Sequence, residues 1–338
     1  MRRRVRAQHS IVPLVLTGAV LAGLAPALAK DVDKESITYR PGDGPCPSAP
    51  EPAEMAGYCA NTFSTNHFSA ANVDTLYSYR PGFQWYGVNH FGYYVGSDNQ
   101  ILLNSDGSAS ERATQGGNMG FTTIGSIPKA PFFVGTAFGG GMYVEMTAAY
   151  DQTKVKKAEG WPALWTLSFE HILNNGSDMW PTPAAPSANY HQWAEFDIVE
   201  HMDDGASNQY YATTHHWYGE GNKSCPGQLW CNIQSVTVIP IAETTTAHKY
   251  GMLWVPATAT QRGFVKWYLD GKQQGQTLSW ARQDATAYPP PPTQDAPWTY
   301  GVIDLNHMAL VFGGGMNSPI TVYDVEVWQA NGRHNVHN

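Results

Sequence analysis

Residues 195–200 (EFDIVE) place three carboxylates in a run that otherwise has the apolar and β-branched residues of a buried strand. Asp and Glu are depleted in strands and rarely buried without partners, so the three acids need an explanation. Side chains alternate between the faces of a strand, which puts Glu195 and Asp197 on one face and Glu200 on the other. One β-bulge near Ile198 and Val199 would return Glu200 to the face of the other two acids, and bulges are common beside active sites.

With such a bulge, the Cα atoms of Glu195 and Glu200 would lie roughly 13 Å apart at ~3.3 Å per residue. Two Glu side chains leaning toward each other could reduce the carboxyl separation to about 5–5.5 Å, which is typical of a retaining glycosidase. One carboxylate is then the nucleophile and the other the proton donor. The alternative is a solvated strand face that carries three acids with no catalytic role.

The segments that flank the acids have their own order and spacing. They are GWPALW (160–165), THHWYG (214–219), YGMLW (250–254), VKWYLDG (265–271), LNHMA (305–309), GGG (313–315) and YDVEVWQ (323–329). From about residue 135 to residue 329, this set resembles glycoside hydrolase family 16, in the laminarinase-like branch with a bulged E-x-D-x-x-E motif. The resemblance implies an all-β fold: a two-sheet antiparallel β-sandwich of the jelly-roll, concanavalin A-like type, with a substrate cleft on its concave face.

The resemblance also implies roles for the three acids. Glu195 would attack the anomeric carbon, Glu200 would act as acid and then base, and Asp197 would orient Glu195 and tune both titrations. Three acids this close cannot all ionise at neutral pH, so at least one pKa is expected to rise, with the proton mainly on Glu200.

Sugar-binding surfaces combine flat apolar rings with hydrogen-bonding groups, and six residues are candidates for that role. They are Trp161, Trp165, Trp193, His216, Trp217 and Asn306. Alternation lets only one of the neighbours His215 and His216 face the acids, and the family's H-[WY]-x-G pattern favours His216. A core role is the alternative for each Trp, a structural role is the alternative for the histidine, and bracing of the acids is the alternative for Asn306.

No cofactor is expected to be required. Asp324 matches a position that often ligates a structural calcium in the family, although no other ligand is visible in the sequence. The expected substrate is a β-linked polysaccharide, with β-1,3-glucan as the default and mixed-linkage glucan or red-algal galactan as alternatives. A transglycosylase on the same fold and a non-catalytic lectin-like module are the alternative functions.

Residues 1–29 have the pattern of a secretory signal peptide, with four early arginines, an apolar run and a small-residue end at Ala27-Leu28-Ala29. Its removal changes the net charge from −8 to −12 and leaves no basic stretch for nucleic acid. A secreted protein, periplasmic or extracellular, is therefore expected. It would be a monomer without membrane attachment after cleavage, and its partner would be a neutral polysaccharide.

The mature chain is expected to form a single domain, residues 30–338. The 33 Gly, 23 Pro and 12 Trp of the full chain, with strand-like runs at 141–149, 163–168, 236–241 and 264–269, favour an all-β structure. Residues 269–272 (LDGK) predict a hairpin turn. Four cysteines in an exported chain allow three pairings, of which the local pairs Cys46–Cys59 and Cys225–Cys231 are expected.

Overall fold

The computed structural model describes most of the chain after residue 45. The described residues are 46, 48–88, 99–114, 116–117, 119–126, 133–173, 178, 189–205, 207–225, 227–258, 260–280, 306–331 and 335–337. They all belong to one compact unit, Ile37–Asn338. The predicted signal peptide lies outside the described residues.

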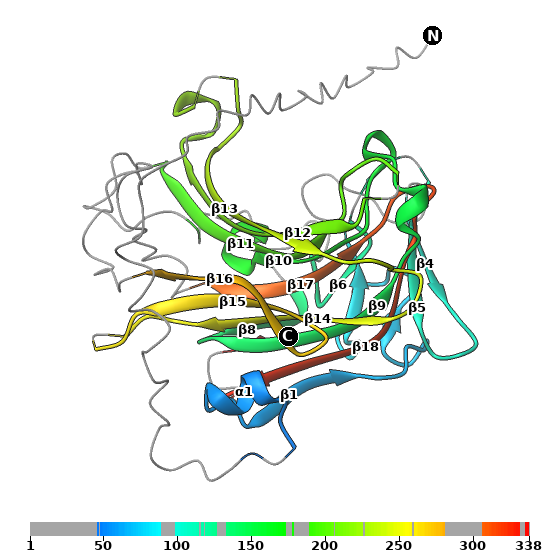
Figure 1. The fold of residues 1–338 in the computed structure, drawn as a ribbon, viewed down its shortest axis with the longest axis horizontal. Helices are drawn as coiled ribbons and strands as arrows, with labels where there is room; N and C mark the ends of the chain where they lie inside the picture. Colours follow the sequence, from blue (N-terminus) through cyan, green and yellow to red (C-terminus); the bar gives the residue numbers. More distant parts are fainter. Residues whose placement is uncertain are drawn as a thin grey trace. The chain divides into compact units, whose positions relative to one another are not determined.

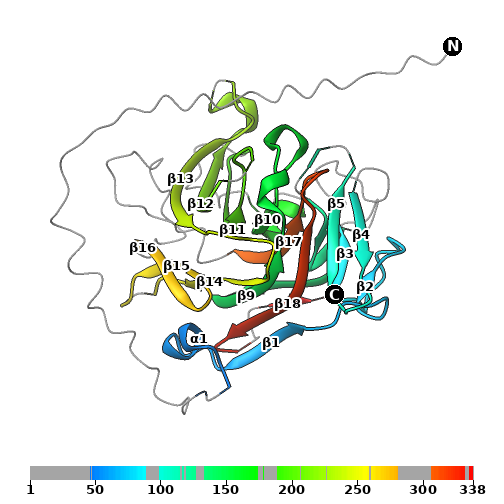
Figure 2. The same cartoon turned by 45° about the vertical axis from the view of Figure 1, so that its right-hand side comes forward.

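Two β-sheets make up the described structure, and Figures 1 and 2 show them as two layers. The eight-stranded sheet has the order β16 (Lys272–Trp280), β15 (Gly263–Leu269), β14 (His248–Val255), β9 (Met142–Ala149), β18 (Ile320–Gln329), β5 (Ala109–Ala113) and β4 (Asn99–Leu103), with β1 (Ala60–Thr65) also paired to β18. The predicted all-β, two-sheet sandwich is confirmed, and the four predicted strands lie within or overlap β9, β10, β13 and β15.

The eleven-stranded sheet carries the candidate site. Its order is β13 (Cys231–Pro240), β12 (Gln209–Gly219), β11 (His191–Glu200), β10 (Ala163–Ser168), β17 (His307–Gly313), β6 (Phe121–Thr122), β3 (Trp85–Gly87) and β2 (Val73–Asp74), and β8 (Phe133–Gly139) pairs with β17, β7 (Ile124–Ser126) and β19 (Val336–His337). Between the described strands every pairing is antiparallel, except that of β2 with β3. The short helices are α1 (Glu51–Met55), α2 (Phe169–Ile172), η2 (Gln152–Lys154), η3 (Lys157–Glu159) and η4 (Gly221–Lys223).

The main core lies between the two sheets and receives inward side chains from both. Phe196 and Leu164 come from the larger sheet, Met252 and Trp254 come from the smaller one, and all four are fully buried. The rings of Phe196 and Trp254 meet with centroids 5.9 Å apart. Burial of each such side chain stabilises the fold by about 1.5–3 kcal/mol, so this contact fixes how β11 lies over β14.

Strand β10 is apolar at almost every position because both of its faces are covered. All six of its residues are buried. Leu164 enters the core between the sheets, whereas Trp165 and Leu167 belong to a second apolar cluster on the outer face of the larger sheet. The candidate site lies on this second apolar cluster.

The turn and disulfide predictions are confirmed. Asp270 and Gly271 both have positive φ, 50° and 75°, and connect β15 to β16, as a two-residue hairpin turn requires. The disulfides are Cys46–Cys59 and Cys225–Cys231. Among the described residues, the helices are too short to span a bilayer.

Candidate active site

Strand β11 carries the three acids, and a β-bulge interrupts it between Asp197 and Glu200. On the β12 side, Ile198 and Val199 both stand opposite the single residue Ala212, and the register toward β10 shifts at the same place. The two bulge residues are buried in the core between the sheets, at 2% and 0% exposed. Because two consecutive side chains point inward, Glu200 returns to the outer face with the other acids, as predicted.

Two tryptophans hold the two outer acids by their indole N–H groups. Trp217 on β12 donates to Glu195 Oε2 at 2.9 Å, and Trp161, just before β10, donates to Glu200 Oε1 at 3.2 Å. Both tryptophans are partly exposed. Each acid therefore has a fixed orientation and lies beside an aromatic ring that reaches the surface.

Asp197, between these acids, is 3% exposed and contacts His215 of β12. His215 Nε2 lies 2.9 Å from Asp197 Oδ2, and Asn232 on β13 donates through its amide to His215 Nδ1 at 2.8 Å. With Nδ1 accepting, the ring proton of a neutral His215 is on Nε2, the nitrogen that lies beside Asp197. The His215 ring also stacks on Trp217, with centroids 5.3 Å apart.

Burial shifts the pKa values of all three acids upward. It raises the pKa of Glu195 to about 8; the charge of Asp197 adds to the shift, His215 opposes it and Glu200 adds to it. Burial, followed by the charge of Glu200, raises the pKa of Asp197 well above its usual range, against a hydrogen bond with Glu195. Burial also raises the pKa of Glu200, against His215 and the Trp161 N–H.

The expectation that at least one pKa rises is confirmed, but the proton is not confined to Glu200. The pKa of Asp197 is raised well above its usual range by burial and by the charge of Glu200, and the pKa of Glu195 is raised as well. A proton can therefore be held in the hydrogen bond that joins Asp197 and Glu195, which orients the Glu195 carboxyl group. Asp197 is thus suited to orient Glu195, and Glu200 is suited to carry a second proton at the surface.

Two of the predicted sugar-binding tryptophans are buried. Trp165 is 5% exposed and Trp193 is 3% exposed. The His171 ring, from α2, lies flat on Trp193 with centroids 3.5 Å apart and an interplanar angle of 5°. The prediction that Trp165 and Trp193 offer open rings to a sugar is therefore wrong, whereas Trp161 and Trp217 remain partly exposed beside the acids.

The prediction for His216 is also wrong. In the register of β11 and β12, Glu195 pairs with His215 and Ala194 pairs with His216, so the His216 side chain points to the opposite face. It is 1% exposed and contacts Gln192. His215 occupies the position beside the acids instead.

Asn306 braces the backbone of β11 next to the acids. It is 4% exposed, its Oδ1 accepts the backbone N–H of Ala194 at 3.0 Å, and its amide donates to Glu170 Oε2 at 3.5 Å. Both ends of the side chain are used, so Asn306 fixes the backbone before Glu195 and does not face a sugar.

The sequence analysis missed a second buried acid at the start of β11. Asp178 is 6% exposed and accepts hydrogen bonds from His171 Nδ1 at 2.6 Å and His191 Nδ1 at 2.8 Å. Burial acts to raise the pKa of Asp178, but the two histidines together hold it below its usual value. Little in the sequence indicates these two contacts, because Asp178 lies 7 residues after His171 and 13 residues before His191.

Asp324, the position expected to hold a structural calcium, has a buried Oδ1 without a hydrogen-bond partner among the described residues. Glu326 accepts from Asn61 and Trp328, and Glu145 accepts from Lys249 at 2.7 Å, and a calcium site at Asp324 stays a prediction. Within the described part of the chain, one group has metal-ligand spacing, with ligand atoms within 4.8 Å of one another: Glu195, Asp197 and His215. Two of these three already bind each other, as His215 and Asp197.

No protein-family model matches this chain, and no curated protein sequence matches it. Three solved structures that are similar to it are an endo-1,3-β-glucanase from Streptomyces sioyaensis, a κ-carrageenase from Pseudoalteromonas carrageenovora and the carbohydrate recognition domain of Emp46p. The glucanase is 15% identical, with 82% of this chain and 97% of the other covered and a TM-score of 0.42.

The carrageenase is 12% identical, with 80% and 97% covered and a TM-score of 0.39. The recognition domain is 10% identical, with 72% and 88% covered and a TM-score of 0.34.

Proposed function

We propose that this protein is a secreted retaining endo-glycosidase that hydrolyses a β-linked polysaccharide by double displacement. The observation that carries the proposal is the bulge in β11, because it brings Glu195, Asp197 and Glu200 to one face while the two bulge residues stay in the core. Three acids grouped on one strand face, one of them buried and two partly buried, cost stability, and such a cost is typical of functional sites. Their raised pKa values are typical of groups that exchange protons during catalysis.

In the first step, the Glu195 carboxylate attacks the anomeric carbon while Glu200 donates its proton to the glycosidic oxygen, and the leaving sugar departs. In the second step, Glu200 takes a proton from water, the water oxygen attacks the anomeric carbon, and Glu195 is released as a carboxylate. Asp197 orients Glu195 through the hydrogen bond between them, and His215 lies 2.9 Å from Asp197 on its other side.

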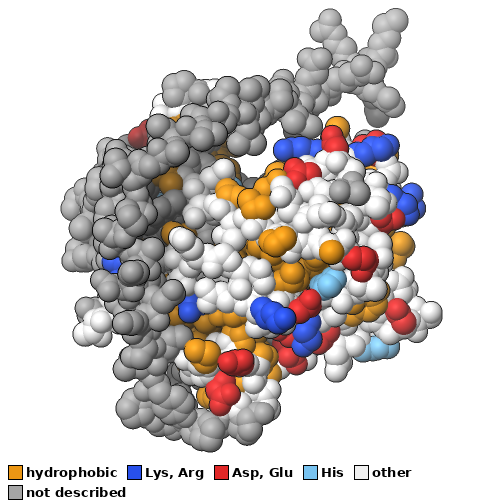
Figure 3. Space-filling view, in the orientation of Figure 1, with side chains coloured by type: hydrophobic (Ala, Val, Ile, Leu, Met, Phe, Trp, Pro, Cys, Tyr) orange, Lys and Arg blue, Asp and Glu red, His pale blue; other side chains and the backbone are white. Residues whose placement is uncertain are grey.

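The polymer is proposed to be neutral, with β-1,3-glucan first, on the basis of the sequence resemblance. On the face seen in Figure 3, acidic and basic side chains are interspersed and do not gather by sign. A surface of that kind offers no extended positive field to a sulfated chain. The partly exposed rings of Trp161 and Trp217 would stack on the C–H faces of the sugar.

The test is a panel of β-1,3-glucan, mixed-linkage glucan and red-algal galactan, with product chromatography and NMR of the first-formed anomer. We expect internal cleavage of one polymer with retained β configuration. An inverted product would refute the roles of Glu195 and Glu200, and binding without reducing-sugar release would favour the lectin-like alternative. Products longer than the substrate would favour the transglycosylase.

A further inference from the structure

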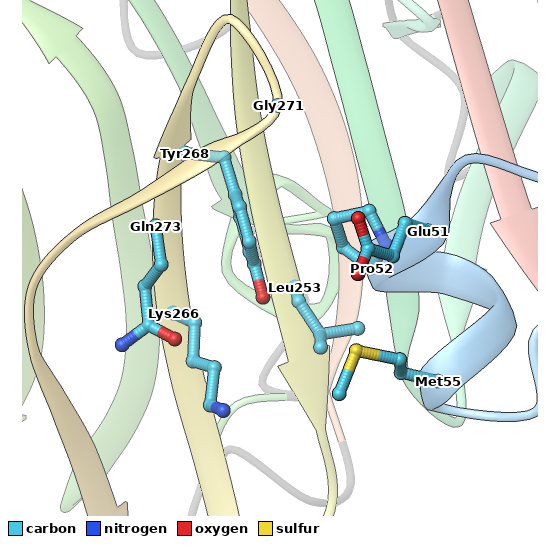
Figure 4. Close-up of a pocket in the computed structure, with 8 residues that line it drawn as sticks. All are labelled: Glu51, Pro52, Met55, Leu253, Lys266, Tyr268, Gly271 and Gln273. Atoms are coloured by element: carbon cyan, nitrogen blue, oxygen red, sulfur yellow. The ribbon is translucent and has the colours of Figure 1, made fainter.

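A second polar site lies on the outer face of the eight-stranded sheet. A cavity of about 200 Å³ opens between α1 and the β15–β16 hairpin (Figure 4). Glu51 and Met55 of α1 form one wall, Lys266 and Gln273 form the opposite wall, and Leu253 and Tyr268 lie between them. The acids of β11 are on the outer face of the other sheet, with the main core between the two sites.

The cavity brings one acid and one base to the same space. Glu51 and Lys266 both line it, and no hydrogen bond or ion pair joins either one to another described residue. The Lys266 ammonium lies over the ring of Phe264, 5.4 Å from its centroid. A group bound in the cavity could accept from the lysine and donate to the carboxylate.

The floor of the cavity supplies a hydroxyl and apolar surface. Burial and then the charge of Glu51 raise the pKa of Tyr268 to about 12, so its hydroxyl remains a donor at neutral pH. Leu253 is buried beside it, and Met55 is 55% exposed on the rim. An apolar floor with an acceptor on one side and a donor on the other matches a pyranose ring, which has C–H faces and a belt of hydroxyls.

One wall of the cavity is held in place by covalent and hydrogen bonds, and the cavity has room for a single sugar ring. The Cys46–Cys59 disulfide encloses α1, and Tyr58 just after it donates to the carbonyl of Trp254 at 3.1 Å. The volume is below the roughly 300–1,000 Å³ of sites for drug-sized ligands, so it takes one sugar unit. One acid and one base cancel, which favours a neutral sugar.

We propose that this cavity is a second saccharide-binding site, which holds one sugar unit of a neutral β-linked polymer and anchors the protein to it away from the acids of β11. The proposal rests on the proposed function only for the identity of the polymer. A weak site is expected, with a Kd on the order of 1 mM for one unit, which becomes useful through many contacts with one polymer.

The test is hydroxyl-radical labelling of the full chain with the Glu195→Gln substitution, read by mass spectrometry. The probes are the β-1,3-linked disaccharide of glucose and a β-linked disaccharide of galactose, each at roughly 10 mM. We expect Met55 labelling to fall about twofold or more with at least one probe, whereas Leu76, 85% exposed and outside the cavity, stays unchanged.

Lys266→Ala should abolish the protection of Met55, and Lys272→Ala should retain it. Lys272 is the matched control, because it pairs with Leu269 and points to the other side of the same hairpin. No protection of Met55 by either disaccharide, or equal protection in Lys266→Ala, would overturn the proposal. If Met55 is protected but the wild-type protein cleaves no polymer, the second saccharide-binding site is supported and only the proposed glycosidase function is refuted.

Discussion

Two buried aspartates of the candidate-site sheet differ in what surrounds them. Asp178 is 6% exposed and receives two imidazole N–H groups, which hold its pKa below the usual value despite burial. Asp197 is 3% exposed and receives one imidazole, but it lies between Glu195 and Glu200, and its pKa is raised well above the usual value. Burial alone therefore does not decide the charge of a carboxyl group here, whereas its neighbours do.

The difference separates a structural acid from a reactive one. Asp178 stays charged and joins His171 to His191, and His171 in turn covers Trp193. Asp197 keeps a proton available beside Glu195 and destabilises the ionised state of the site. Such a loss of stability is common at sites where groups exchange protons.

The largest effect is expected for Glu195→Gln, which removes the nucleophile and keeps the shape of the side chain. Turnover of the polysaccharide should fall about 10⁴-fold or more, because no covalent intermediate can form. Glu145→Gln is the matched control, because Glu145 pairs with Lys249 on the other sheet and should leave turnover unchanged. Residual activity of a tenth of wild type in Glu195→Gln would contradict the assignment.

Glu200→Ala should separate two kinds of substrate. Polysaccharide cleavage is expected to fall by about 10³-fold, because the leaving oxygen is no longer protonated. An activated aryl glycoside needs little proton donation in the first step, so its loss should be much smaller when the first step is measured by the burst of aryl leaving group. Equal losses on both substrates would show that Glu200 is not the acid.

The comparison between the two aspartates is tested by the pair Asp197→Asn and Asp178→Asn. Asp197→Asn should lower kcat about 100-fold because the amide can donate a hydrogen bond to Glu195 but cannot exchange a proton with it, with stability equal to or above wild type. Asp178→Asn should cost about 2–3 kcal/mol of stability through its two charge-assisted hydrogen bonds, with kcat of the folded protein nearly retained. Thermal unfolding and steady-state kinetics measure both, and the reverse pattern would refute the distinction.

The smallest effect is a pH dependence of stability. Glu195 has a folded-state pKa of about 8 against an ordinary 4.5, so it is protonated in both states below pH 4.5, and its ionisation costs stability as the pH rises toward 8. Glu195→Gln should therefore match wild type at pH 4 and exceed it by roughly 1–2 kcal/mol near pH 8.

The lowered pKa of Asp178 has the opposite sign. Its contribution is present above the ordinary aspartate pKa and is lost as the pH falls through the lower folded-state value. Asp178→Asn should therefore lie below wild type at neutral pH, and the two should converge in acid. Unfolding curves between pH 3 and pH 8 test both signs together, and parallel curves for either variant would contradict the assigned shift.

The all-β class, the hairpin turn at 270–271, both disulfides and the bulge could be predicted from local patterns: alternation, turn residues and spacing along one segment. The two-sheet sandwich was predicted from the family resemblance. The bulge was predictable because an odd interval between Glu195 and Glu200 cannot place both on one face of a regular strand.

The surroundings of the acids could not be predicted in the same way. The choice between His215 and His216 depends on the register of β12 against β11, which places His215 beside Glu195. The burial of Trp193 depends on a four-residue helix that brings His171 onto its ring. Such contacts join distant segments through packing, and a local pattern does not contain them.

The bulge also sets which changes of length this chain can tolerate. Surface loops accept added or lost residues at small cost, and the bulge gives β11 a similar tolerance, because Ile198 and Val199 together occupy one step opposite β12. Loss of one of these two residues would restore a regular strand in which Asp197 and Glu200, two positions apart, still share the outer face. Relatives that share this chemistry could therefore carry either a bulged or a regular strand here, with the three acids on one face in both.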